Sequence, residues 1–274
     1  HTDTVVLIDE EQLFGEVRDG ALWGLGSADM KGACAAAVEA AIAVHRSGVA
    51  LNRRVMIALV VGEEEYGDGC EALPDAFLAP LVVVGEPTEL APCTRHFSYE
   101  EIHLSTRGAR AHAALPEHGA NAIHAMLSWS LAILDGTERE AWEEPVAVNP
   151  RTIRGGDTMF AIAEACSAEL DAHLPPGTDV ERVRRIVETA AKETSGSHTG
   201  CSYTWESVFS AEGYSLHDDA RLAPLRRAFE ACDEQWLPSD FRSHSDAAAL
   251  FARGVAPVVC GPGSLSVAHT VHEH

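Results

Sequence analysis

The chain has 274 residues, enough for one large domain or two ordinary ones and for at least one buried hydrophobic core. Its 42 acidic and 20 basic side chains give a formal net charge of -22. A surface this acidic repels phosphate backbones, which argues against nucleic acid as a partner. No apolar run reaches the length of a membrane span, so we expect no membrane partner either.

Seven cysteines are scattered along the chain, at positions 34, 70, 93, 166, 201, 232 and 260. Their odd number and the lack of a Cys-x-x-Cys pair indicate neither a disulfide framework nor a cysteine zinc site. Reduced thiols are typical of a cytoplasmic protein, which is the location we expect. The chain opens directly on His1 without a leader, which suggests a fragment of a longer protein.

The first part of the chain and its end predict helices and buried strands. Residues 33–47 are rich in strong helix formers, and Gly48 can end that helix. Residues 55–61 form a continuous apolar run, as expected of a strand that is buried on both faces, and 81–84 and 255–260 have the same character. Apolar strands separated by helical segments favour an α/β layer with a largely parallel sheet.

The middle of the chain has a different pattern, in which strands alternate in polarity and helices are amphipathic. The predicted elements are, in chain order, strand 101–108, helix 121–136, strands near 151–154 and 162–173, helix 179–194 and strand 202–208. This β-α-β-β-α-β order is that of a ferredoxin-like unit. We therefore expect a small α+β domain at 94–208, inserted into an α/β domain made of 1–93 and 209–274.

Potential metal ligands follow each of the predicted buried strands. These are the run Glu63–Glu65, then Glu86, and finally His269. In open α/β sheets the site forms at the carboxyl ends of the strands, so side chains far apart in sequence converge there. Consecutive Glu64 and Glu65 point in different directions in an extended chain, so one can bind a metal while the other handles a proton.

Two further segments complete the set of candidate ligands. His1 and Asp3 lie two residues apart and face the same way in an extended chain, so Asp3 could orient the His1 imidazole. Asp29 follows a glycine-rich stretch that lets the backbone approach a metal closely. Each feature alone is more often a surface turn or a helix cap, but two histidines and three carboxylates together suit a pair of zinc ions.

In combination, the motifs resemble those of the M20 metallopeptidase family. The matching stretches are HTDTV (1–5), GLGSADMKG (24–32), EEEYG (63–67), GEPTE (85–89), AHAALPEHGANAI (111–123), GGDTMF (155–160), LDAHLPPG (170–177) and GPGSLSVAHTVHE (261–273). The resemblance implies a zinc-peptidase-like three-layer catalytic domain with an inserted dimerisation or lid domain, and a homodimer formed through that lid. It also implies that both ends of a family member are missing from this sequence.

The resemblance assigns the ligands of two Zn²⁺ ions, with Co²⁺ or Mn²⁺ as alternatives. Asp29 is similar to the carboxylate that bridges both ions, and the family has a cis peptide bond after it, which we expect between Asp29 and Met30. His1 and Glu86 correspond to the other ligands of one ion. Glu65 and His269 correspond to those of the second ion.

The resemblance also assigns three residues to the chemistry. Glu64 is similar to the general base, which leaves Glu63 without a role, and Asp3 to the acid that orients His1. His112 is similar to a lid-domain histidine that reaches the active site of the partner subunit and stabilises the oxyanion.

The sequence departs from the family at two positions that usually help to bind the substrate. The family usually has Asn where this chain has Phe160 and Arg where it has His173. A phenyl ring donates no hydrogen bonds and a neutral imidazole lacks the bidentate fork of Arg. The departure argues against recognition of an ordinary α-amino-acid carboxylate at these two positions.

The functional expectation is a two-metal hydrolase that cleaves the amide bond of an N-acyl amino acid or a peptide-like small molecule. One alternative is an amidohydrolase for a small acylated metabolite that lacks a free α-carboxylate, and another is a dipeptidase or carboxypeptidase. A metal-binding dimer without catalysis is a third, and the presence of Glu64 and of all five ligands argues against it.

Overall fold

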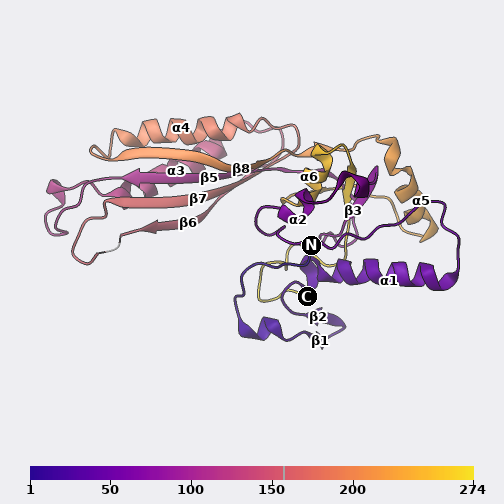
Figure 1. The fold of residues 1–274 in the computed structure, drawn as a ribbon. Coiled ribbons are helices and arrows are strands. Elements are labelled where there is room, and N and C mark those ends of the chain that lie inside the picture. The colour runs from indigo at the N-terminus through magenta and orange to yellow at the C-terminus, as the bar shows by residue number, and fades with distance from the viewer. Residues whose placement is uncertain (157) are drawn as a thin grey trace. The chain divides into compact units, whose positions relative to one another are not determined.

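The computed structural model describes residues 1–156 and 158–274, which divide into two units (Figure 1). Unit 1 consists of His1–His96 and Tyr214–His274, and unit 2 consists of Phe97–Gly213. Among the described residues, no helix is long and apolar enough to cross a membrane.

Unit 2 is a four-stranded antiparallel sheet with two helices. The elements in chain order are β5 (Ser98–Arg107), α3 (Ala122–Arg139), β6 (Ala147–Gly155), β7 (Ala165–Leu174), α4 (Glu181–Ser195) and β8 (Ser202–Ala211), with a short 3-10 helix at Pro116–His118. The strands lie in the order β6-β7-β5-β8. The chain order β-α-β-β-α-β confirms the ferredoxin-like arrangement predicted from the alternating strands.

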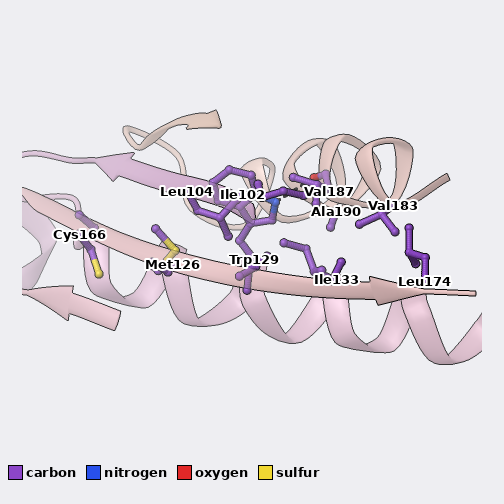
Figure 2. Close-up of a cluster of buried hydrophobic side chains, with 14 residues drawn as sticks. Ile102, Leu104, Met126, Trp129, Ile133, Cys166, Leu174, Val183, Val187 and Ala190 are labelled. Atoms are coloured by element: carbon purple, nitrogen blue, oxygen red, sulfur yellow. Dashed lines mark hydrogen bonds between the residues drawn. The ribbon is translucent and has the colours of Figure 1, made fainter. Parts of the chain in front are cut away.

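The core of unit 2 lies between this sheet and the two helices. Every second residue of β5 and β7 is buried, as expected of strands with one covered face. Figure 2 shows Ile102, Leu104 and Trp129 among the side chains that fill the space. Trp129 is completely buried, and its indole N–H donates to the carbonyl of Val187 at 2.9 Å, so its polar atom is satisfied.

Helix α3 extends beyond its predicted end. It runs through Gly136 to Arg139, so the prediction that Gly136 ends the helix is wrong. A Cβ atom at Gly136 would lie 2.9 Å from a methyl carbon of Ile186, a residue of α4. The glycine therefore permits the two helices to pack closely. The sequence predicts a helix end at Gly136, but its place in the structure is a close contact between helices.

Unit 1 contains a mixed five-stranded sheet. Its strands are β3 (Leu81–Val84), β4 (Cys93–His96), β9 (Tyr214–Ser215), β10 (Ser239–Phe241) and β11 (Ala256–Val259). Strand β11 is parallel to β3 and antiparallel to β4, which is in turn parallel to β10 and antiparallel to β9. Sheets with helices confirm the α/β class, and parallel β3 and β11 are the strands predicted at 81–84 and 255–260.

Several helices and a hairpin accompany this sheet. They are α1 (Gly32–Ser47), α2 (Asp68–Glu71), α5 (Ala223–Ala231), α6 (Asp246–Ala252), a π-helical turn at Ser27–Lys31, 3-10 helices at Glu10–Leu13, Asp75–Phe77 and Ala220–Leu222, and the β1 (Glu16–Arg18) and β2 (Ala21–Trp23) pair. Helix α1 ends at Gly48 in the left-handed conformation, which confirms the predicted helix and its end. Phe241, Leu250 and Val258 belong to the core of this unit.

The segment 55–61 does not form the predicted strand. The carbonyls of Val60 and Val61 accept hydrogen bonds from Thr2 and Gly69, but in the described chain no ladder runs along the segment. Its apolar side chains remain accessible, with Val55 68% and Val61 59% exposed. An apolar run signals a buried strand only where neighbours cover it, and the prediction of burial on both faces is wrong here.

Candidate metal centre

The candidate ligands of unit 1 lie in turns and irregular segments next to helices and strands. Glu86 comes two residues after the end of β3, and the start of α1 packs against this point. A Cβ atom at Gly85 would lie 2.6 Å from the Cβ of Ala33 and 2.7 Å from the Cε of Met30. Only a glycine lets the end of the strand and the beginning of the helix approach this closely, and the approach brings Glu86 to Asp29.

Asp29 lies at the centre of the cluster and faces two histidines with its two carboxylate oxygens. Its Oδ1 is 3.1 Å from Nε2 of His1, and its Oδ2 is 3.3 Å from Nε2 of His269. The side chain is buried, and the peptide bond between Asp29 and Met30 is cis, as predicted. Residues from three distant parts of unit 1 therefore meet at a single carboxylate.

His1 contacts further carboxylates from other turns. Its Nε2 lies 3.5 Å from Oε2 of Glu63 and 3.7 Å from Oε2 of Glu86. On the other side of the ring, Nδ1 lies 3.1 Å from the carbonyl oxygen of Asp3 and 3.4 Å from its Oδ1. Asp3 also accepts a hydrogen bond from the backbone N–H of Glu64 at 3.1 Å, so it links the His1 segment to the glutamate turn.

The glutamate run forms a closed turn between Gly62 and Gly67, both in the left-handed conformation. The carbonyl of Gly62 accepts from the N–H of Gly67 at 2.7 Å. Within this turn, Glu64 reaches His269, with 3.2 Å between Oε2 and Nε2, and Glu63 reaches His1. Glu65 is exposed, and the structure does not bring it into the cluster.

Two overlapping groups of donor atoms follow from these contacts. One ligand atom each from His1, Glu63 and Glu86 lies within 4.8 Å of the other two, and the same holds for His1, Asp29 and Glu64. Among the residues with an assigned role in the sequence analysis, the structure assembles His1, Asp3, Asp29, Glu64, Glu86 and His269. It adds Glu63, which the sequence analysis left without a role, and leaves out Glu65.

The crowding of carboxylates changes the pKa values of the cluster. Burial, together with the charge of Glu86, raises the pKa of Glu63 to about 9. Burial and the neighbouring Asp29 raise the pKa of Glu86 to about 8, although His1 opposes the shift. These carboxylates therefore repel one another in a region that water solvates poorly.

The two histidines respond in the opposite direction. Burial alone would lower the pKa of His1, but the contacts with Asp29 and Glu86 raise it to about 12. Hydrogen bonds to Asp29 and Glu64 raise the pKa of His269 to about 10. Burial would raise the pKa of Asp29, but the hydrogen bonds with His1 and His269 lower it. The carboxyl groups of the cluster thus favour positive charge on the two neighbouring imidazoles.

The donor set fits divalent metal ions. Oε1 of Glu64 and Oε1 of Glu86 are buried and have no hydrogen-bond partner, although the other oxygen of each carboxylate contacts a histidine. Buried carboxylate oxygens are normally paired or bound to a metal. Imidazole nitrogens and carboxylate oxygens are ligands that zinc prefers, and Co²⁺ and Mn²⁺ accept the same donors.

Sequence reasoning missed two buried acids beside the cluster. Asp246 is the first residue of α6, and burial raises its pKa to about 6. Glu273 is 3% exposed and accepts hydrogen bonds from the backbone of Ala28 and Asp29. Asp246 gave no signal beyond a plausible helix start after Ser245, and Glu273 none beyond its place four residues after His269.

The remaining candidate residues lie in unit 2. His112 is exposed, its Nδ1 accepts from the N–H of Ala114 at 3.1 Å, and it forms a β-bridge with Ala161. Phe160 is 72% exposed with a φ of 58°, and its carbonyl accepts from the N–H of Ala113. The structure therefore brings His112 and Phe160 into one loop region. Asp157 of the GGDTMF motif lies outside the described residues.

His173 lies elsewhere in the same unit. It is the penultimate residue of β7, where it pairs with Tyr99 of β5, and the two rings are 5.1 Å apart. Phe160 precedes the other end of this strand. A strand of this length spans roughly 30 Å, so within a single chain Phe160 and His173 do not line the same small subsite.

Comparisons with known proteins show which family and which relatives the chain resembles. The profile of Peptidase family M20/M25/M40 matches residues 1–274. The acetylornithine deacetylase of Myxococcus xanthus is 29% identical over 267 residues, which cover 94% of this chain and 68% of that protein. The acetylornithine deacetylase of Edwardsiella ictaluri is 27% identical over 292 residues, which cover 100% of this chain and 73% of that protein.

Solved structures share the fold at lower identity. An aminopeptidase PepT from Bacillus cereus matches with a TM-score of 0.67 and 18% identity, over 95% of this chain and 70% of that one. A tripeptidase from Staphylococcus aureus matches with a TM-score of 0.61 and 19% identity, over 78% of this chain and 57% of that one.

Proposed function

Because this chain belongs to Peptidase family M20/M25/M40 and is a hydrolase of amide bonds, we propose that it removes the acyl group from an N-acyl amino acid with the help of two divalent metal ions. The named relatives at 25–29% identity, all acetylornithine deacetylases, support this substrate class. One alternative substrate is a small acylated metabolite without a free α-carboxylate. Another is a short peptide, because a tripeptidase and an aminopeptidase are among the proteins of similar fold.

The single observation that carries the two-metal proposal is the position of Asp29 between two histidines. Each of its carboxylate oxygens faces a different imidazole, at 3.1 and 3.3 Å. In the proposal, His1, Asp29 and Glu86 hold one ion, and Asp29, Glu64 and His269 hold the second. Zinc suits this set, and Co²⁺ or Mn²⁺ would be accepted by the same ligands.

The glutamate register that the geometry supports differs by one residue from the one predicted from sequence. Glu64 lies 3.2 Å from His269, so we assign it as a ligand in place of Glu65. Glu63, beside His1, is then the carboxylate left to handle the proton. Asp3 accepts from the Glu64 N–H and lies against the His1 ring, so it holds both ligand segments in register.

The bound ions would supply an acidified water and positive charge for the carbonyl oxygen of the substrate. Positive charge nearby would also favour the ionised form of Glu63, whose pKa burial and Glu86 otherwise raise. Glu63 would then accept a proton from the water as its oxygen attacks the carbonyl carbon. When the C–N bond breaks, the same carboxyl would give that proton to the leaving amine nitrogen.

A homodimer formed through unit 2 is part of the proposal. His112 and Phe160 lie in one loop region, whereas His173 lies roughly 30 Å away along β7. If all three face a substrate, as their counterparts in the family do, they must come from two chains. His112 would then donate a hydrogen bond to the oxyanion in the site of the partner subunit.

Seven free cysteines in the described chain support a cytoplasmic location.

The test combines metal content and turnover in the same preparations. The protein is stripped with a chelator, reloaded with Zn²⁺ or Co²⁺, and analysed for bound metal and for hydrolysis of acetylated amino acids. We expect about two ions per chain, with turnover that requires them, and the Asp29→Ala variant should lose both. One ion per chain that Asp29→Ala retains would contradict the shared ligand, and no turnover of any acylated amino acid would contradict the substrate class.

A further inference from the structure

Glu273 holds the backbone that carries Asp29. Its Oε1 accepts hydrogen bonds from the N–H groups of Ala28 at 3.2 Å and of Asp29 at 3.0 Å. Its own backbone carbonyl accepts from the N–H of Gly24 at 3.2 Å. The side chain is only 3% exposed, so it is buried where an unsatisfied carboxylate would be unfavourable. A single residue thus holds the glycine-rich loop at both of its ends.

The N–H groups that donate to Glu273 lie just before helix α1, in a stretch that is not regular helix. Asp29 and Met30 have non-helical φ and ψ, and α1 begins at Gly32. The hydrogen bonds that Ala28 and Asp29 donate to the Glu273 carboxylate are charge-assisted, so they are stronger than hydrogen bonds between neutral groups. Glu273 therefore satisfies two backbone N–H groups that precede the regular helix.

The segment 269–273, which ends at Glu273, also contacts the Asp29 side chain. His269, four residues before Glu273, lies 3.3 Å from Oδ2 of Asp29. Between the two, the carbonyl of Thr270 accepts from Nε2 of Gln12, whose own backbone carbonyl accepts from Leu25 in the glycine-rich loop. The segment 269–273 therefore fixes both the backbone and one carboxylate oxygen of Asp29.

We infer that Glu273 is a positioning residue for the metal centre, which keeps Asp29 oriented so that each of its oxygens faces its own site. The inference rests on the proposed two-metal function. Glu273 contacts neither of the histidines that face Asp29 in the described contacts, so it acts through the Asp29 backbone. The backbone at Asp29 is not helical, with φ -112° and ψ 95°, so the helix itself does not impose this orientation.

The experiment measures Co²⁺ binding to the whole chain, because Co²⁺ reports both affinity and ligand geometry through its visible spectrum. Glu273→Ala should weaken Co²⁺ binding about 10–100-fold, the usual loss when a residue that orients a ligand is removed, and should alter the spectrum. Glu273→Gln should recover most of the affinity, since its amide oxygen still accepts from both N–H groups. Glu230→Gln, an exposed glutamate of α5, is the matched control and should bind as the wild type does.

Each outcome bears on the inference. A folded Glu273→Ala protein with wild-type affinity and spectrum, but a lower unfolding temperature, would overturn it and leave Glu273 a purely structural residue. Glu273→Gln binding as weakly as Glu273→Ala would overturn the hydrogen-bond account. If the alanine variant does not fold, the glutamine variant decides alone: near wild-type affinity supports the inference, and a 10-fold or greater loss overturns it. A wild type that binds no Co²⁺ refutes the metal centre itself, which separates that failure from this one.

Discussion

The two units differ in how their important residues are specified. In unit 2, the sheet and two helices bury fourteen residues in a shared core, and every second residue of the ten-residue strands β5 and β7 is buried. In unit 1, the important residues lie in turns and termini, and a whole apolar segment, 55–61, stays accessible. Unit 2 is built from periodic patterns, whereas the candidate metal centre of unit 1 forms where irregular segments meet.

This difference has an energetic side. The buried groups of unit 2 are mostly apolar, so their burial is favourable without a ligand. The buried groups of the candidate metal centre include Glu63 and Glu86, whose pKa values rise because of burial and mutual repulsion. We therefore expect substitutions in unit 2 to change stability, and substitutions in the cluster to change metal binding and turnover.

The largest expected effect comes from the glutamate turn. In the proposed register, Glu63→Gln should lower kcat about 10²–10⁴-fold while metal content stays near that of the wild type, because only the proton acceptor is lost. Glu64→Gln should lose the second ion, because it removes a ligand oxygen that faces His269. Steady-state kinetics and elemental analysis of the same samples measure both.

Glu65→Gln is the matched control for that series, since it lies in the same run but is exposed. It should have little effect on either measurement. If Glu65→Gln loses metal and Glu64→Gln loses only turnover, the register predicted from sequence is right and the one drawn from the geometry is wrong.

The next largest effect tests how much the apolar core of unit 2 contributes to stability. Trp129→Ala should lower the free energy of unfolding by about 3–5 kcal/mol, because it removes a fully buried indole and leaves a cavity. Denaturant unfolding followed by circular dichroism measures the change. Leu131→Ala is the control, because Leu131 lies on the same helix but is 62% exposed. It should change stability by no more than about 0.5 kcal/mol. Equal losses in the two variants would contradict the assignment of the core to this face of α3.

Much of the fold could be predicted where a pattern was long enough to show its period. Helix α1 with its end at Gly48, strand β3 and the strand–helix order of unit 2 follow from the sequence. The short elements β10 and α6 have three and seven residues, too few for a period to be recognised. Segment 55–61 has the composition of a buried strand, but composition does not reveal whether a neighbour covers it.

The candidate site shows the same limit more sharply. The sequence predicted His1, Asp29, Glu86 and His269 as ligands because each occurs in a motif that resembles those of the family. It could not fix the register of Glu63–Glu65, because three identical residues in a row give no alternation from which to read direction. The turn between Gly62 and Gly67 determines which of them face inward. Glu273 escaped notice because its role lies in hydrogen bonds to a backbone more than 240 residues away.

The smallest expected effect concerns Phe160 and His173, the positions where the family resemblance predicts Asn and Arg. A site without those hydrogen-bond donors should discriminate weakly in favour of a free carboxylate, since an apolar surface neither rewards nor strongly rejects a polar group. We expect similar kcat/KM values for acetylated amino acids and their amides at pH 8. The double change Phe160→Asn with His173→Arg should raise kcat/KM for the free acids on the order of 10-fold, because it restores a bidentate cation and a donor.

Met159→Ala is the matched control for this last test, because Met159 is 79% exposed and lies next to Phe160 but has no assigned contact with substrate. It should leave the preference between acids and amides unchanged. The single variants distinguish the two positions, because Phe160 lies in the loop before β7 and His173 lies near the far end of that strand. If the two positions serve one substrate from two chains, each single change should give part of the gain in the dimer. A wild type that strongly prefers the free acids, together with a double variant that gains nothing, would show that another cation of this chain binds the carboxylate.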